Sequence, residues 1–232
     1  MIWWHGISSY DVGVIVERYP ARPVPKRKGS SQSVAGRSGD LIDQEDAWDN
    51  VVQPYDVYLS GEFRGGMQSV AREAIQWLMV KGYQKLEDSY DLDTFRLAYF
   101  MGGNDFANTL NLFGRAKIEF NCKPQRFLHD GDTEKILSAG AVLINPTIYT
   151  ARPRILLSGS GSGSLTVGSR TMELTDVAGT IIDSDTEDVY RGTTNLNSTA
   201  SGEFPLLEAG ETRITWGGGI TGVRITPRWY VL

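Results

Sequence analysis

Hydrophobic and polar residues alternate most clearly in residues 114–128. Ile118, Phe120 and Cys122 share one side of this pattern, and charged or amide residues occupy the other. A period of two residues is typical of a β-strand with one buried face. We therefore predict a strand whose regular ladder ends, or becomes an edge, at Pro124. Cys122 is expected to be a buried, inert thiol.

Helical spacing is convincing in one stretch, residues 67–81. Apolar residues recur there every three or four positions, Gly65 and Gly66 precede them, and Gly82 fits a C-cap. We expect the apolar stripe of this helix to pack on a sheet. Upstream, the alternation of Val12, Val14 and Val16 predicts a strand within residues 10–19. Residues 51–59 predict a second strand.

The pattern changes near residue 145, where lysine disappears and short strands follow one another closely. The predicted strands are 154–157, 165–167, 172–174, 180–183, 188–191, 212–216 and 222–226. This spacing is typical of an antiparallel β-sandwich. We therefore predict a mainly β protein with two domains, residues 1–144 with the single helix and residues 145–232. The Gly/Ser run at 158–164 is interpreted as a flexible hairpin loop.

The glycine-rich residues 217–222 match the spacing of a dinucleotide-binding loop. That motif needs a helix directly after it, so that backbone amides point at the pyrophosphate. The strand-like residues 223–226 and Pro227 follow instead. We predict a hairpin turn.

Composition excludes several classes of protein. The 232 residues include 26 glycines, 9 prolines, 2 histidines and a single cysteine, and the net charge is −5. One cysteine cannot form an internal disulfide or a cysteine-based zinc site, and two histidines cannot build a three-histidine metal site. No apolar run approaches the roughly 18 residues of a membrane helix, and the first residues do not look like a signal peptide. We expect a soluble chain made in a cytoplasm.

Two oppositely charged segments are adjacent. Residues 22–37 contain five basic and no acidic residues, and residues 40–49 contain five acidic ones. The simplest interpretation is a solvated loop. The alternative is a contact surface for a partner of opposite charge. The candidate interface residues on the basic side are Arg22, Lys26, Arg27, Lys28 and Arg37.

No reaction centre is recognisable. Residues 183–188 resemble the start of a calcium loop, but Asp188 stands where that loop needs glycine. Cys122 and His129 are separated by a proline, and nothing brings them together. Glu87, Asp88, Asp91 and Asp93 form a charge run without a pairing that sequence can establish. There is no phosphate-binding loop and no nucleophile elbow in a strand–turn–helix context. We assign no catalytic, cofactor-binding or metal residues and expect no enzyme.

Three segments together resemble a known family. Residues 34–41, after a Tyr19–Pro20 arm, have the pattern V-x-G-R-x-G-x-L. Residues 114–127 have G-x-A-x-I-x-F-x-C-x-P-x-x-F. Residues 204–210 and 223–229 have F-P-x-L-x-x-G and V-x-I-x-P-R-W. In this order they resemble the distal tail proteins of siphophages, with Thr212 as a departure where the family often has asparagine.

The resemblance implies an N-terminal β-barrel-like or sandwich domain related to tail-tube folds and a C-terminal galectin-like β-sandwich. It implies a hexameric ring, a hub that joins the tail tube to the tail tip or baseplate. The implied partners are further copies of the chain, the tail tube protein, the tail-tip hub protein, the tape-measure protein and a receptor-binding protein, with DNA only in transit through the channel. The implied location is the virion, after synthesis in the bacterial cytoplasm.

Two mechanisms and two other functions stay open. The basic and acidic segments could join neighbours in the ring, or the basic residues could face the channel or the tube. A carbohydrate-binding module is the alternative function, with Trp216 and Tyr190 as a candidate aromatic platform, although alternation places Trp216 inward. A cell-wall hydrolase is the third hypothesis for the function. Trp3, Trp4, Trp229 and Tyr230 at the chain ends are expected in the core rather than at an interface.

Overall fold

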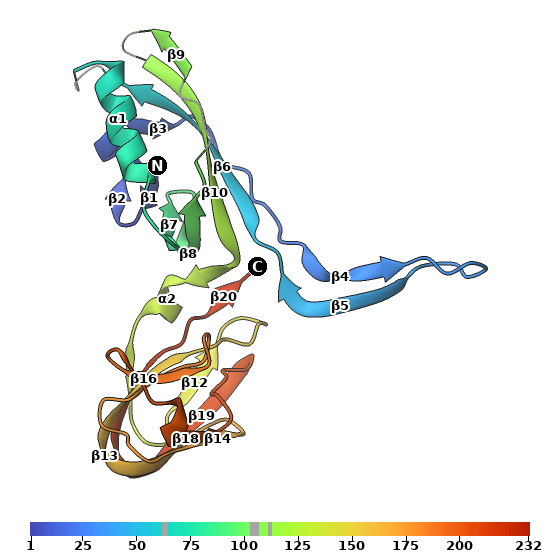
Figure 1. Ribbon diagram of the computed structural model, residues 1–232, viewed down its shortest axis with the longest axis vertical. Helices are drawn as coiled ribbons and strands as arrows, with labels where there is room; N and C mark the ends of the chain where they lie inside the picture. Colours follow the sequence, from blue (N-terminus) through green and yellow to red (C-terminus); the bar gives the residue numbers. More distant parts are fainter. Residues whose placement is uncertain (62–64, 103–106, 111–112) are drawn as a thin grey trace. The chain divides into compact units, whose positions relative to one another are not determined.

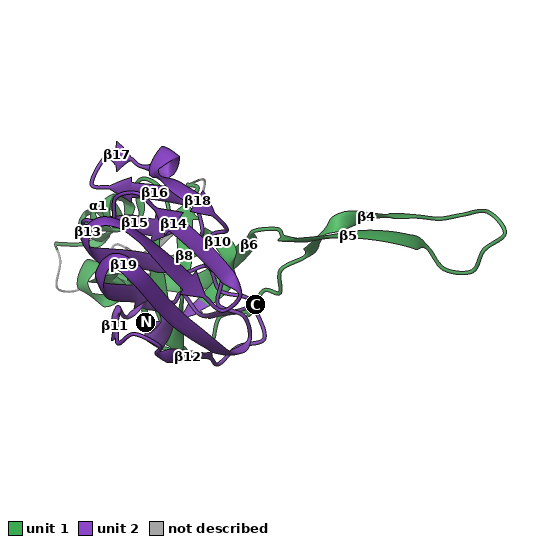
Figure 2. Ribbon diagram, turned by 90° about the horizontal axis from the view of Figure 1, so that it is seen from below, with its two compact units in different colours: residues 1–126, 232 green, residues 127–231 purple. Residues whose placement is uncertain are grey.

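The computed structural model describes residues 1–61, 65–102, 107–110 and 113–232. It is mainly β, as predicted, and has two compact units. Unit 1 comprises residues 1–126 with Leu232, and unit 2 comprises residues 127–231 (Figure 2). Among the described residues, no helix is long and apolar enough to cross a membrane.

Unit 1 is built on one antiparallel sheet and one helix (Figure 1). The strands of this sheet are β1 (Ile2–Trp4), β2 (Ile7–Ser8), β3 (Val14–Val16), β6 (Val51–Ser60), β7 (Gln84–Asp88), β8 (Asp91–Phe100), β9 (Ala107–Leu110) and β10 (Phe113–Leu128). The helices of the unit are the 3-10 helix η1 (Ser9–Val12) and α1 (Met67–Leu78). The sheet order is β2-β1-β7-β8-β10-β6-β3, and β9 also pairs with β10. A separate two-stranded sheet consists of β4 (Arg27–Gln32) and β5 (Leu41–Trp48).

The core of unit 1 follows from alternation on β6 and β10. The two strands pair antiparallel with Ile118 opposite Tyr55. Every second residue points inward, so Ile118, Phe120 and Cys122 are all fully buried, as the sequence predicted. Trp4 packs against Phe120 in the same core, with the ring centroids 4.8 Å apart and the ring planes tilted by 48°. Burying one such large apolar side chain contributes about 1.5–3 kcal/mol.

The predicted helix exists but is shorter than expected. α1 begins at Met67 as predicted and ends at Leu78, three residues before the expected end. The backbone of Met79 leaves the helical region, and its N–H closes the last turn on the Ile75 carbonyl. Gly82 is therefore not the cap. The stripe of the helix packs into the core through Val70, Ala74 and Leu78 among others.

The strand expected around residues 10–19 is only partly present. Ser9–Val12 forms a 3-10 helix, and only Val14–Val16 forms a strand. The break lies at Gly13, whose φ of 73° is a left-handed conformation that glycine adopts without strain. The alternating valines are therefore divided between two elements.

Unit 2 is an antiparallel sheet around its own core. Its elements are α2 (His129–Asp132), β11 (Lys135–Leu137), β12 (Val142–Asn145), β13 (Arg154–Val167), β14 (Arg170–Leu174), β15 (Ile181–Asp183), β16 (Asp188–Arg191), β17 (Thr194–Asn195), the 3-10 helix η2 (Asn197–Thr199), β18 (Ala200–Gly202), β19 (Gly210–Thr226) and β20 (Tyr230–Val231). The order is β11-β19-β13-β15-β16-β17; β12 also pairs with β19, and β14 pairs with β13 and β18.

The units divide at residues 126/127, whereas the sequence predicts a domain boundary at residues 144/145. The reason is strand pairing. β11 lies before residue 145 and β12 begins before it, yet both pair with β19 near the end of the chain. The loss of lysine therefore falls inside unit 2. Trp229 is buried in the core of this unit, as expected for an aromatic chain end.

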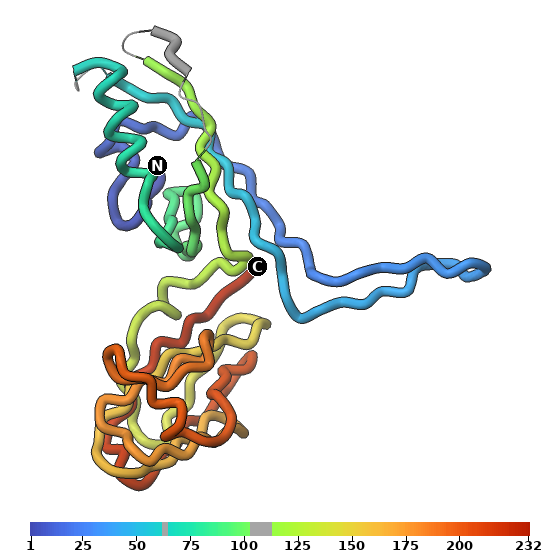
Figure 3. The backbone as a smooth tube through the Cα atoms, viewed as in Figure 1, coloured from blue at the N-terminus to red at the C-terminus, as the bar shows by residue number. Residues whose placement is uncertain are grey.

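The two glycine-rich segments are strands, so the predicted flexible loop and hairpin turn are both wrong. Residues 158–164 lie inside β13 and residues 217–222 inside β19, and the two strands pair along this stretch with shifts of register. A Cβ added to Gly219 would lie 1.8 Å from the Ser160 carbonyl oxygen. The glycines therefore allow the two backbones to approach where they bend past one another (Figure 3).

Candidate interaction surface

The candidate interface residues lie on or beside the hairpin of β4 and β5, which we call the arm. The strands pair antiparallel, with Arg27 opposite Trp48 and Gln32 opposite Leu41. In the view of Figure 2 the arm extends away from the rest of unit 1. The expected solvated loop is therefore an ordered hairpin, and the basic and acidic segments form its two sides.

The arm has no buried face. All residues from 28 to 46 are exposed, including Leu41 at 51% and Ile42 at 65%. Both strands are edge strands, so each carries a row of backbone groups that no neighbouring strand covers. A hairpin that stands alone is at best marginally stable in water. The arm thus offers apolar side chains and free strand edges to another molecule.

Charged side chains are arranged unevenly on the arm. Arg27 donates to the Asp46 carboxylate and to the Glu45 carbonyl, each at 3.2 Å, and its guanidinium lies 4.5 Å from the Trp48 ring centre. Lys26, Lys28 and Arg37 are exposed, and no ion pair joins them to any described residue. Arg27 therefore already has partners within the arm, whereas these three cations face solvent.

The base of the arm is held on the sheet of unit 1. Arg22 reaches the Tyr90 carbonyl at 3.4 Å and the Asp91 carboxylate at 3.7 Å. The buried Gln53 donates to the Ala21 carbonyl at 2.8 Å. Arg22 is thus a candidate interface residue whose present contacts are structural: it secures the segment that leads into the arm.

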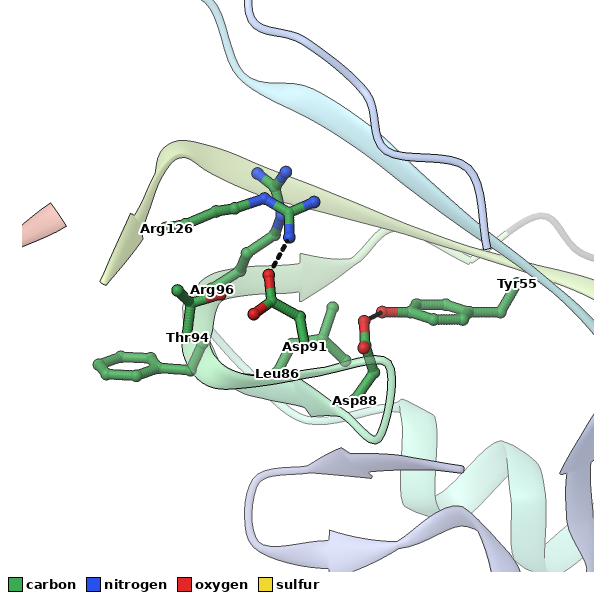
Figure 4. Close-up of a pocket in the computed structure, with 8 residues that line it drawn as sticks. Tyr55, Leu86, Asp88, Asp91, Thr94, Arg96 and Arg126 are labelled. Atoms are coloured by element: carbon green, nitrogen blue, oxygen red, sulfur yellow. Dashed lines mark hydrogen bonds and ion pairs between the residues drawn. The ribbon is translucent and has the colours of Figure 1, made fainter. Parts of the chain in front are cut away.

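Asp91 belongs to a polar cluster inside unit 1 (Figure 4). Its carboxylate accepts a hydrogen bond from Arg126 at 2.9 Å, and Asp88 accepts one from the Tyr55 hydroxyl, also at 2.9 Å. Burial, and then the charge and hydrogen bond of Asp88, raise the pKa of Tyr55 well above its usual value. Arg96 lies in the same cluster and is 5% exposed. Asp88 and Asp91, two of the carboxylates that the sequence grouped as a run, are therefore each bound to a neighbouring donor.

The other candidate groups also have structural surroundings. Burial raises the pKa of the Cys122 thiol to about 12, which removes its nucleophilic form at neutral pH. Asp183, the first residue of the calcium-like segment, receives two hydrogen bonds from Arg228. Within the described ranges, no group of three or more His, Cys, Asp and Glu side chains could hold a metal ion.

The sequence did not predict that the arm is a β-hairpin or that Arg96 is buried. The arm carries no alternating apolar face, so only its charge pattern marked it. Arg96 follows the buried Phe95 on β8, and strict alternation would place it outward. No pattern in the sequence signals a buried arginine at that position.

Comparisons with known proteins give one consistent result. No model of a known protein family matches the sequence, and no curated protein matches it. Among solved structures, the Dit protein (gp 19.1) of phage SPP1, described as a hub adsorption apparatus in phages that infect Gram-positive bacteria, matches with a TM-score of 0.72. The identity is 13%, and the alignment covers 97% of this chain and 96% of that one.

Two structures of the phage P2 baseplate in its activated conformation, with Ca and with Sr, match with TM-scores of 0.57 and 0.55. In both, the identity is 10%, and 92% of this chain and 89% of the other are covered. The structural likeness spans both units, and it confirms at the level of the fold the resemblance that the sequence motifs indicated. The chain has the fold of the SPP1 Dit protein.

Proposed function

We propose that the chain is a structural hub protein of a phage tail, whose copies form a hexameric ring between the tail tube and the tail tip or baseplate. The observation that carries this proposal is the likeness to the SPP1 hub protein over nearly the whole of both chains. A shared arrangement of two β units along both chains supports a shared architectural role more strongly than a match to one unit would.

The arm is the surface on which we place the contact between neighbouring copies. A ring needs a heterologous contact, in which one patch of each copy meets a different patch of the next, and rotation closes the circle. The arm supplies uncovered strand edges and exposed Leu41 and Ile42. Lys26, Lys28 and Arg37 are the cations available to such a contact, and Arg22 secures its base.

The hub role makes the tube protein, the tip hub protein and the tape-measure protein the partners, with a receptor-binding protein further out and DNA in transit through the ring. We propose no enzymatic activity. The buried Cys122 thiol and the paired carboxylates Asp88 and Asp91 support this, because each group is already occupied by a structural role.

Sugar binding is not favoured by the candidate platform. Trp216 is partly buried and packs against the core of unit 2, so its ring does not form an open stacking surface. Tyr190 is also partly buried, and its hydroxyl lies 3.4 Å from Nε of Arg154.

Immunogold electron microscopy of the phage particle that carries this chain tests the proposed role. Antibodies against the purified chain should place gold at the junction between the tail tube and the tip. Labelling of the capsid, or no labelling of intact and tip-exposed particles, would reject the hub assignment.

A further inference from the structure

We propose that the uncovered edge of β12 in unit 2 pairs with the same edge of a second copy of the chain, in a two-fold contact. The strand β12 (Val142–Asn145) pairs with β19 on one side, and among the described strands none pairs with its other side. A two-fold contact does not close a ring, so this surface is separate from the arm. The proposal therefore does not depend on the hub function.

The first argument is exposed apolar surface. All residues of unit 2 are described, and its exposed large apolar side chains all lie in residues 136–148: Ile136, Val142, Ile144 and Ile148. Val142 and Ile144 are two residues apart on β12 and so share one face of the strand, with exposed fractions of 42% and 63%. Apolar side chains of this size beside a free strand edge favour the addition of another strand.

The second argument is the direction of the backbone groups. The Ala141 carbonyl accepts a hydrogen bond from the Ile214 N–H at 2.8 Å, so Ala141 faces β19. Because this direction alternates along an antiparallel strand, Val142 and Ile144 point their N–H and C=O groups away from β19. Outside the β12–β19 ladder, no described residue hydrogen-bonds these groups. Two copies related by a two-fold axis at Leu143 would satisfy all of them, because Val142 of each copy would exchange two hydrogen bonds with Ile144 of the other.

The third argument is charge, which selects one register. Glu211 lies opposite Ile144 on β19, and Arg213 lies opposite Val142. Both charged side chains are exposed, and neither has an ion-pair partner among the described residues. In the register centred on Leu143, each row of side chains across the two copies ends in Glu211 of one copy and Arg213 of the other. A slip by two residues would place two glutamates or two arginines in one row, which their like charges disfavour.

The contact is small. A strand of four residues buries far less surface than the roughly 1,200 Å² of a stable interface, and Pro146 has no N–H with which to extend the ladder. The pairing is therefore reversible and depends on concentration.

A cysteine at the two-fold axis tests the contact in the full chain. In Leu143→Cys, the two Cα atoms would lie about 4.5 Å apart, within the range of a disulfide, and diamide oxidation should give a disulfide-linked dimer on a non-reducing gel. The matched control is Leu137→Cys on β11, since both leucines are partly buried and pack against the same core. It should crosslink at least several-fold more slowly. No dimer of Leu143→Cys, or equal crosslinking of both variants, would overturn the proposal.

A charge exchange in the Leu143→Cys chain tests the register. Arg213→Glu should slow crosslinking several-fold, because each row would then end in two carboxylates. The additional change Glu211→Arg should restore the rate. A rate that is unaffected by both changes would contradict the proposed register.

Sedimentation velocity provides a test without an added cysteine. Between about 10 µM and about 1 mM, the range in which contacts of a few kcal/mol become populated, the mean mass should rise above the 25.6 kDa of one chain. Ile144→Lys, which places a charge in the middle of the contact, should reduce this rise at least about two-fold. Ile136→Lys changes an isoleucine that is 79% exposed on β11 and should leave the rise unchanged. Equal mean masses of all three chains would rule out pairing through β12.

Discussion

Arg27 and Asp46 face one another across the two strands of the arm, with Nη1 3.2 Å from Oδ1. The basic and acidic segments of the sequence are thus partners within one hairpin. The Asp46 side chain is fully exposed, so this ion pair adds little to stability. The charges that remain for a neighbouring copy are those outside the pair, and they define the first prediction.

Reversing both Lys26 and Lys28 to glutamate should weaken assembly and leave the fold intact. Both side chains are exposed and flank Arg27, so their reversal changes the charge of the arm without removing a buried contact. We expect the circular dichroism spectrum and the melting midpoint of the isolated chain to change little, and ring particles in a mixture with the tube and tip proteins to decrease at least several-fold.

The matched control reverses Lys81 and Arg213, which are exposed and lie outside the arm. This variant has the same net charge and should assemble normally. Unimpaired assembly of the arm variant in negative-stain images would show that Lys26 and Lys28 do not contribute to the interface.

Gly219→Ala should destabilise unit 2 by more than about 2 kcal/mol, because the new Cβ would collide with the Ser160 carbonyl and force the two strands apart. Gly222→Ala is the matched control. Its Cβ would be 3.7 Å from the Ser158 side chain, an ordinary contact, so the loss should stay below about 1 kcal/mol. Urea unfolding of the two variants measures the difference. Equal stability of both would mean that the glycine-rich stretches do not pair as described.

Sequence pattern predicted those elements whose burial alternates. β10 was predicted as residues 114–128 and spans Phe113–Leu128, because each second side chain enters the core. β13 was predicted as two strands, because its central Gly/Ser run contains no apolar side chains and so shows no alternation of buried and exposed residues. In that run β13 pairs with β19 through closely approaching backbones. Such pairing produces no hydrophobic pattern in the sequence.

The candidate surface was predictable only through charge. The arm buries nothing, so its strands lack the alternation that marked β10, and only the succession of five basic and five acidic residues singled it out. The ionic cluster of Asp91, Arg96 and Arg126 gave no signal, because its members come from β8 and β10 and meet only when the sheet forms. Tertiary contacts of this kind have no counterpart in local sequence.

Asp183→Asn should lower the stability of unit 2 at pH 7 by about 2 kcal/mol, since it removes the charge that both Nη atoms of Arg228 contact at 2.6 and 2.9 Å. Burial alone would raise the pKa of Asp183, but the hydrogen bonds and charge of Arg228 outweigh it and hold the pKa below its usual value.

A lowered folded-state pKa gives stability that is present above the unfolded pKa of about 3.9 and is lost as the pH falls through the folded one. The difference between the unmodified protein and Asp183→Asn should therefore shrink below about pH 4. Urea unfolding at pH 7 and pH 3, with the exposed Glu211→Gln as control, measures it. A difference that stays constant with pH would show that the ion pair does not carry this stability.

Cys122 should resist thiol reagents in the folded chain. With a pKa of about 12 and no exposed surface, only about one thiol in ten thousand is ionised at pH 8, and the reagent cannot reach it. Labelling with a disulfide reagent at pH 8 should proceed only in denaturant. Rapid labelling of the native protein would contradict the burial of this strand face.

The most direct test of the ring is the mass of the assembled particle. Light scattering combined with negative-stain imaging should be applied to the chain alone and to its mixture with the tube and tip proteins. We predict ring-shaped particles with hexameric mass for this chain in the mixture, whatever the state of the isolated chain. A mixture in which the chain remains a monomer beside assembled tube and tip proteins would contradict it.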